Sequence, residues 1–128
     1  MRIGTDIVEI ERIQHVLQTY PNQFPKIVFT EAEIASAPAN EQARLAYFAG
    51  RWAAKEAIAK ALGCGFGANC AWKELEISNL PGGEPVVELS GNALQTFKEL
   101  DGLKLSVSIS HERHYATAVA LLEEKVER

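Results

Sequence analysis

The chain has 128 residues, a length that fits one compact domain over residues 1–128. Its 47% of hydrophobic and 23% of charged residues are ordinary for a globular protein, and two cysteines are too few for a disulfide scaffold. No stretch approaches the ~20 apolar residues of a membrane helix, and the net charge of −4 argues against a general nucleic-acid binder. We therefore expect neither a membrane nor a nucleic acid as partner.

The N-terminal segment predicts a location, a strand and a helix. Its first ten residues contain Asp6 and Glu9 and lack the apolar core of a signal peptide, which favours a cytoplasmic protein. Arg2 to Val8 is a predicted strand. Glu9 to Tyr20 is a predicted helix, because apolar residues recur on one face and Pro21 ends the pattern.

Capping signals predict two further helices. Thr30 with Glu33 three residues later forms a capping box for a short helix. Asn40 caps the longest predicted helix, from Glu41 to Leu62, which alanine and other strong helix formers fill. Three glycines end this helix, namely Gly63, Gly65 and Gly67.

A hairpin and a short helix are predicted next. Trp72 to Ser78 and Pro85 to Leu89 are the two arms of the hairpin, and residues 79–83 form its turn. Ser90 is the predicted N-cap of the following helix.

The C-terminal part predicts a second hairpin. Lys104 to Ser110 alternates apolar residues with serines at a period of two, and Tyr115 to Leu122 is nearly all apolar. Helices mixed with mostly antiparallel strands indicate an α+β fold, in which the sheet packs with one long central helix and shorter helices.

Asp6 lies inside the first predicted strand, between Thr5 and Ile7. Aspartate is disfavoured in strands, and a buried carboxylate is costly unless it is paired or bound to a metal. The local pattern alone favours an exposed position on an edge strand, and both interpretations stay open at this point.

The long helix carries charges next to its apolar face. Lys55 falls inside that face, Glu56 lies on its border and Lys60 follows one turn later. One interpretation is an ion pair between Glu56 and Lys60, with Lys55 reaching solvent along its aliphatic stem. The other is that Asp6 and Glu56 hold one Mg²⁺ while Lys55 and Lys60 meet phosphate oxygens.

Two other segments allow a plain and a functional interpretation. The glycine-rich run 63–67 is either a simple helix stop or a place where the backbone approaches a nucleotide. Ser108, Ser110 and His111, at the end of a predicted strand, are either solvated or bind phosphate. A serine hydrolase is poorly supported, because no G-x-S-x-G motif is present.

These segments together resemble the holo-[acyl-carrier-protein] synthases, the short type of 4'-phosphopantetheinyl transferase. Ile3–Ile10 with Arg12–Ile13 is similar to their opening signature. Phe48–Ala57, continued by Lys60–Gly63, is similar to their central W/F-x-x-K-E-A-x-x-K signature. Ser108–His111 resembles their S-x-S-H element. The order and the spacing of the segments both fit.

The resemblance implies a phosphopantetheinyl transferase fold and a Mg²⁺-dependent transfer. The enzyme would move 4'-phosphopantetheine from coenzyme A to a serine of an apo acyl carrier protein, releasing adenosine 3',5'-bisphosphate. Asp6 and Glu56 would ligate Mg²⁺, Glu56 would also act as the base, and Lys60 would steady the diphosphate. The implied coenzyme A contacts are Arg51, Lys55, Lys60, Gly63, Gly65, Gly83, Pro85, Ser110 and His111.

The resemblance also implies partners and an assembly. The short members of this family act as homotrimers, with active sites between neighbouring subunits. Arg12 matches a position that contacts the acidic carrier, and a basic surface near Arg2, Arg12, Lys26 and Arg44 would oppose that partner locally. The alternatives are a non-catalytic coenzyme A or nucleotide-binding module, a structural oligomerising domain, and a different Mg²⁺ enzyme acting on nucleotides.

Overall fold

Helices and antiparallel strands are mixed along the chain. The computed structural model describes residues 1–67 and 70–126. The elements are β1 (Arg2–Glu9), α1 (Ile10–Thr19), α2 (Gln23–Val28), α3 (Glu31–Ala35), α4 (Glu41–Leu62), the 3₁₀ turn η1 (Trp72–Glu74), β2 (Leu75–Asn79), β3 (Pro85–Leu89), α5 (Gly91–Glu99), β4 (Gly102–His111) and β5 (Tyr115–Glu124). The predicted α+β fold is confirmed.

The strands form two antiparallel sheets. One has the order β1-β5-β4 and the other is the β2–β3 hairpin. Successive side chains on a strand face opposite sides, so three alanines and a leucine of β5 share the face that is buried: Ala116, Ala118, Ala120 and Leu122. Asp6 on β1 and Ile109 on β4 both pair with Ala118, so the three residues form one row on this inner face.

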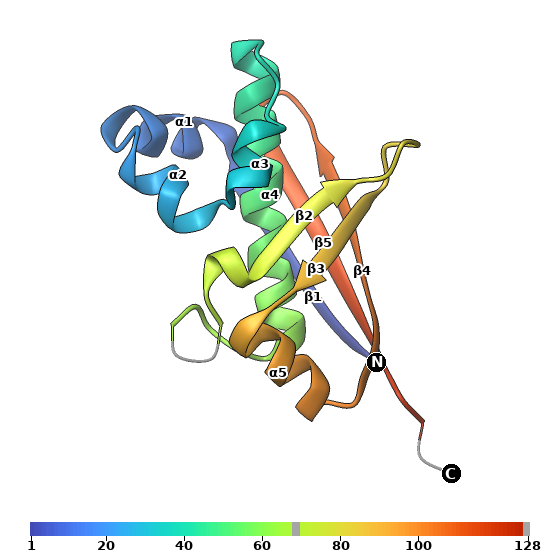
Figure 1. The fold of residues 1–128 in the computed structure, drawn as a ribbon. Coiled ribbons are helices and arrows are strands. Elements are labelled where there is room, and N and C mark those ends of the chain that lie inside the picture. Colours follow the sequence, from blue (N-terminus) through green and yellow to red (C-terminus); the bar gives the residue numbers. More distant parts are fainter. Residues whose placement is uncertain (68–69, 127–128) are drawn as a thin grey trace.

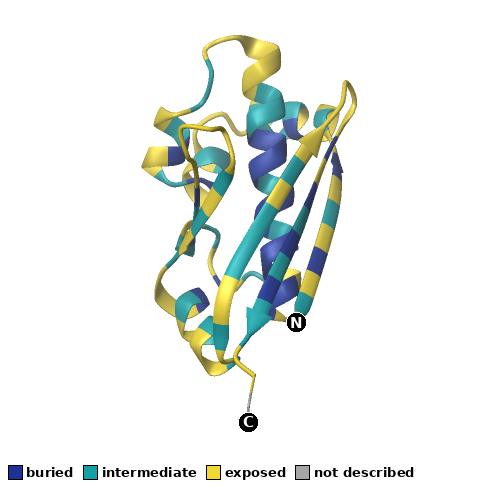
Figure 2. Ribbon diagram, turned by 90° about the vertical axis from the view of Figure 1, so that its right-hand side faces the viewer, coloured by how far each residue is buried: buried dark blue, intermediate teal, exposed yellow. Residues whose placement is uncertain are grey.

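Helix α4 runs through the middle of the molecule (Figure 1), with the three-stranded sheet on one side and the hairpin and the short helices on the other. Figure 2 shows that buried residues concentrate along α4 and the strands beside it. From Phe48 to Leu62 only Trp52, Glu56 and Lys60 are not buried. The helix is therefore covered on nearly all sides, rather than along one apolar stripe.

Strand β1 lies directly against α4 at Gly4. A Cβ atom added to Gly4 would clash with the carbonyl oxygen of Ala57 and would lie 2.8 Å from the backbone nitrogen of Ala61. Because only glycine fits at this contact, the strand packs on the helix backbone itself. This close packing brings the next inward-facing residue of β1, Asp6, alongside the helix.

Several predicted boundaries are confirmed, and others needed correction. Helix α4 has the predicted bounds and the predicted Asn40 cap, and Thr30 with Glu33 forms the predicted capping box. Glu9 belongs to β1 rather than to the first helix, and Trp72 belongs to η1 rather than to the hairpin. Ser90 makes no cap bond with its side chain, because the backbone nitrogen of Asn92 donates to Glu74 Oε2 at 2.5 Å instead.

Candidate functional site

Asp6, Glu56 and Lys60 come together where β1 passes α4. Strand β1 is an edge strand of the sheet, and Asp6 faces inward from it with a side chain that is 17% exposed. Lys60 donates to the carbonyl oxygen of Thr5 at 2.8 Å and lies 3.4 Å from the Asp6 carboxylate. The ion pair therefore joins Lys60 to Asp6, whereas the plain interpretation of the sequence paired it with Glu56.

The electrostatics of Glu56 show that the two carboxyl groups are neighbours. Burial raises the pKa of Glu56 most, the negative charge of Asp6 raises that pKa further, and the charge of Lys60 lowers it in part. A carboxyl pushed in this direction holds a proton more readily than usual, and a nearby divalent cation would relieve the repulsion between the two carboxylates.

The donor set fits a hard cation that keeps other ligands. Asp6 and Glu56 supply carboxylate oxygens, which Mg²⁺ prefers, and Mg²⁺ commonly takes only one or two protein carboxylates beside water and substrate phosphates. Among residues 1–67 and 70–126 there is no group of three or more His, Cys, Asp or Glu residues that could form a complete metal cage. The pair therefore suits Mg²⁺ shared with a diphosphate better than a closed structural metal site.

Lys55 is not available to a phosphate, so that sequence prediction is wrong. Its side chain is 0% exposed and forms an ion pair with buried Glu33 at 2.7 Å. The ammonium also donates to the carbonyl oxygens of Val28 at 2.7 Å and Trp72 at 3.0 Å. All three protons thus bind protein oxygens, and burial lowers the pKa of Lys55 while Glu33 raises it in part.

Arg51 is also largely internal. It is 8% exposed, its Nη2 donates to Asn79 Oδ1, and its guanidinium lies 4.1 Å from the centre of the Tyr47 ring. Its Nε is the one buried side-chain nitrogen or oxygen of the described chain that has no hydrogen-bond partner. A phosphate contact by Arg51 stays a prediction, and only part of its guanidinium is left for it.

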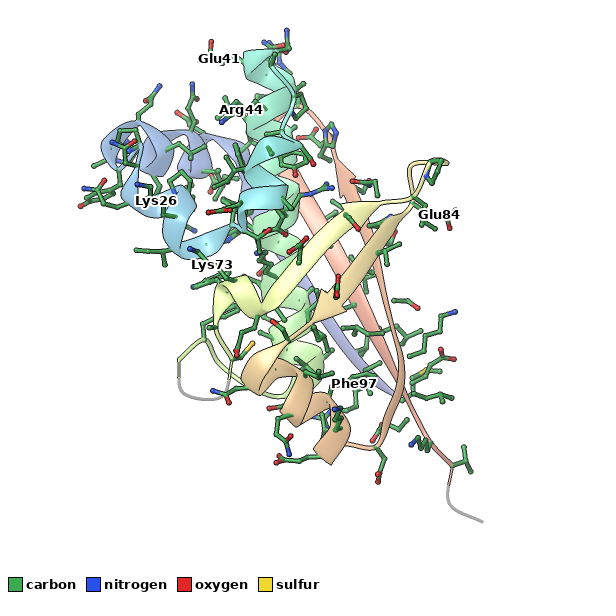
Figure 3. The ribbon with its side chains drawn as sticks, viewed as in Figure 1. Lys26, Glu41, Arg44, Lys73, Glu84 and Phe97 are labelled. Carbon is green, nitrogen blue, oxygen red and sulfur yellow. The ribbon has the colours of Figure 1, made fainter. Side chains whose placement is uncertain are left out.

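The predicted pocket glycines lie at two separate turns. Gly63 ends α4 in the left-handed conformation, with φ 73°, and a Cβ atom there would lie 2.5 Å from Arg2 Nη2. Around Gly65 nothing lies within 4 Å of an added Cβ atom. Gly83, with φ 96°, belongs to the hairpin turn, whose tip carries Glu84 (Figure 3), and Pro85 is the first residue of β3 after that turn. Whether these residues line a nucleotide pocket stays a prediction.

His111 and Ser110 lie away from the carboxylate pair and face opposite sides of the sheet. His111 pairs with Ala116 on β5, and Ala116 pairs with Val8 on β1. Two strand spacings, together about 10 Å, therefore separate His111 from β1. Ser110 shares the outer face with Thr117. Within one subunit, neither residue reaches the site formed by Asp6 and Glu56.

An open groove of about 1200 Å³ lies on the His111 side of the molecule. It is bordered by the starts of α1 and α4 and by the turn between β4 and β5, and its described lining includes Glu9, His111, Arg113 and His114. Asp6 and Glu56 are not among the described residues that line it. Arg113 and His114 were missed from the sequence, since a short polar turn after a strand gives no signal of its own.

The basic residues do not form one surface. Arg12 is exposed on α1, and Lys26 on α2 and Arg44 on α4 lie at the same end of the molecule (Figure 3). Arg2 is at the other end of β1, and its Nε donates to the carbonyl oxygen of Ala61 at 2.7 Å. The predicted basic surface therefore excludes Arg2, and Arg12 as a carrier contact stays a prediction.

Comparison with known proteins places this geometry in a family. The family model of the 4'-phosphopantetheinyl transferase superfamily matches residues 2–120. A holo-[acyl-carrier-protein] synthase of Shewanella amazonensis is 44% identical over 120 residues, which are 94% of this chain and 95% of that protein. One of Gloeobacter violaceus is 43% identical over 117 residues, covering 91% of this chain and 88% of that protein.

The fold is shared with solved structures of such synthases. The Helicobacter pylori protein in complex with coenzyme A has a TM-score of 0.84 and 30% identity, covering 94% of this chain and 99% of that one. The Neisseria meningitidis protein has a TM-score of 0.87 and 28% identity, covering 96% of this chain and 98% of that one. The predicted phosphopantetheinyl transferase fold is confirmed.

Proposed function

Because the chain belongs to the 4'-phosphopantetheinyl transferase superfamily, we propose that it is a holo-[acyl-carrier-protein] synthase. It transfers 4'-phosphopantetheine from coenzyme A to a serine of an apo acyl carrier protein and releases adenosine 3',5'-bisphosphate. The observation that carries the proposal is the contact of β1 with α4, where Lys60 forms an ion pair with Asp6 at 3.4 Å and Glu56 lies one helical turn before Lys60.

Asp6, Glu56 and Lys60 at the β1–α4 contact have different roles in the proposed reaction. The serine hydroxyl attacks the β-phosphorus of coenzyme A, and Glu56 removes its proton. Lys60 supplies a positive charge beside the diphosphate. Asp6 and Glu56 would hold Mg²⁺, which neutralises charge on the diphosphate oxygens.

A site shared between subunits is the second part of the proposal. Within one chain, Asp6 lies on β1 and Glu56 lies beside it on α4, at one edge of the sheet. His111 lies on β4, the strand at the opposite edge. The outer face of the sheet has no covering element among the described residues, and it exposes 65% of Ile3 and 66% of Ile7. A homotrimer that buries this face and brings His111 of one copy to the carboxylates of the next would complete the site.

We further propose an acidic acyl carrier protein as the partner and the cytoplasm as the compartment. The basic side chains of Arg12, Lys26 and Arg44 would bind the acidic acyl carrier protein through local charge complementarity. Both cysteines are free thiols, which fits the reducing cytoplasm. No helix in the described part of the chain is long and apolar enough to cross a membrane.

A mass measurement tests the transfer directly. The protein is mixed with coenzyme A, Mg²⁺ and an apo acyl carrier protein, and the carrier is then weighed by mass spectrometry. We expect the carrier to gain the mass of one phosphopantetheine group. Asp6→Ala and Glu56→Ala should each abolish the gain while circular dichroism shows an intact fold. Binding of coenzyme A without any mass gain would instead favour a non-catalytic binding module.

Mixing two inactive variants tests the shared site. Asp6→Ala and His111→Ala are purified separately, then unfolded and refolded together. If one active site takes its carboxylates and its histidine from different subunits, some mixed trimers contain one intact site and activity returns. No return of activity, with mixed trimers confirmed by native mass spectrometry, would refute the shared arrangement.

A further inference from the structure

The turn of the β2–β3 hairpin is closed by the side chain of its first residue. Asn79, the last residue of β2, donates from Nδ2 to the carbonyl oxygen of Gly83 at 2.8 Å. The backbone closes the same turn, from Leu80 N to the oxygen of Glu84 at 2.9 Å and from Gly83 N to the oxygen of Leu80 at 2.8 Å. The side-chain bond therefore fixes the carbonyl group of Gly83. This residue has a φ of 96°, which few residues other than glycine adopt.

The other atom of the Asn79 amide ties the turn to the central helix. Its Oδ1 accepts from Nη2 of Arg51, which lies on α4. An arginine has only donors, so the amide must present its oxygen to Arg51 and its nitrogen to Gly83. Both ends of the Asn79 side chain are thereby used, and its orientation is set by its partners.

Arg51 is itself held firmly. It is 8% exposed and lies over the ring of Tyr47, whose hydroxyl donates to the carbonyl oxygen of Glu33 at 2.5 Å. The carboxylate of Glu33 also accepts from the backbone nitrogen of Ile77 on β2 at 2.8 Å. The hairpin is thus joined to the core at Ile77 by a buried contact and at Asn79 by a contact just below the turn.

We propose that Asn79 is a positioning residue for coenzyme A, because its amide nitrogen holds the carbonyl of Gly83 while its amide oxygen is held by Arg51. This inference rests on the proposed function and on the prediction, implied by the family resemblance, that Gly83 and Pro85 contact coenzyme A. A turn that is already ordered loses less conformational entropy when the ligand binds. Asn79 acts on nucleotide affinity and not on the chemical step, since Asp6 and Glu56 lie at the β1–α4 contact.

Two substitutions at Asn79 and one control test the inference. Asn79→Ala removes both bonds. Asn79→Asp keeps an oxygen for Arg51 but turns a second oxygen, instead of a donor, towards the carbonyl of Gly83. The matched control is Ser78→Ala, the exposed neighbour on β2, for which the described structure shows no side-chain hydrogen bond. Calorimetry with 3',5'-ADP gives the affinity, and steady-state kinetics give kcat and both KM values.

Both Asn79 variants should bind 3',5'-ADP about tenfold more weakly, the worth of one hydrogen bond. The KM for coenzyme A should rise equally, while kcat and the KM for the carrier stay unchanged. Ser78→Ala should match the wild type. Wild-type affinity in Asn79→Ala, or a loss confined to kcat, would overturn the inference. So would unfolding of either variant, since Asn79 would then hold the fold rather than the pocket.

Ligand binding by the wild-type protein distinguishes a failure of the proposed function from a failure of this inference. A wild-type protein that binds neither 3',5'-ADP nor coenzyme A would overturn that function, and this inference with it. A wild-type protein that binds both, with unchanged binding in the Asn79 variants, would overturn the inference alone.

Discussion

The ammonium of Lys60 on α4 lies 3.4 Å from the carboxylate of Asp6 on β1. The same nitrogen donates to the backbone of Thr5 at 2.8 Å, so one side chain ties the helix to the edge strand. Glu56, one helical turn before Lys60, stands beside both charges.

We expect opposite shifts of the Glu56 pKa in two variants. Asp6 raises this pKa and Lys60 lowers it, so Asp6→Asn should lower the pKa of Glu56 and Lys60→Ala should raise it. Titration of the glutamate side-chain carbons by NMR, in metal-free buffer, measures both values without relying on activity. Shifts in the same direction in the two variants would show that the three side chains do not interact as described.

The charge of Glu56 should lower stability near neutral pH. Because its pKa is raised in the folded state, the folded chain binds more protons than the unfolded chain between the ordinary pKa of 4.5 and the raised one. Stability is therefore lost as the pH rises through that window. Glu56→Gln should be more stable than the wild type in urea unfolding at pH 7 and equally stable well below pH 4.5. A variant that is less stable at pH 7 would refute this.

The buried pair of Lys55 and Glu33 should be costly to break. Lys55→Met leaves the carboxylate of Glu33, which is 1% exposed, without its cation, and we expect a loss of about 3–5 kcal/mol in unfolding free energy. The exposed Lys73→Met is the matched control, with a change of at most about 0.5 kcal/mol. Urea unfolding measures both.

The double variant Lys55→Met/Glu33→Gln measures how much of the lost stability comes from the Lys55–Glu33 ion pair itself. Removing the second charge should return part of the lost stability, because no unpaired carboxylate remains. A double variant that loses the full sum of the two single changes would show that the ion pair itself contributes little.

Gly4→Ala should force β1 away from α4. The added methyl group meets backbone atoms of Ala57 and Ala61, which cannot rotate away, so we expect a loss of about 1–3 kcal/mol or more and loss of transfer. Gly82→Ala is the glycine control for stability, since its nearest neighbour is a flexible side-chain oxygen of Glu84 at 3.6 Å. Equal stability of the two variants in urea would contradict the close packing.

Local signals in the sequence were sufficient for most elements and for two of the three predicted caps, but they missed α2, and the predicted Ser90 cap was wrong. Helix α4 and its Asn40 cap follow from residues within a few positions of one another, and so does the Thr30–Glu33 capping box. The interior partners were not predictable in this way. Lys55 finds Glu33, 22 residues earlier in the chain, and spacing along the helix carries no information about such a contact.

In the candidate site, too, some residues were predictable from the sequence and some contacts between distant residues were not. Asp6 and Glu56 were paired by their residue types and by resemblance, and the packing at Gly4 supplies the physical reason for their approach. The link from Arg51 to Asn79 escaped prediction, because an asparagine at the end of a strand is typical of any turn. Its role became visible only when the partners of both amide atoms were known.

A crystal structure with Mg²⁺ and coenzyme A tests the central claim most directly. We predict one ion at about 2.0–2.1 Å from a carboxylate oxygen of Asp6 and from one of Glu56 in the same subunit, with the diphosphate as a further ligand. An ion that binds only one of these residues, or a diphosphate bound far from both, would contradict the account.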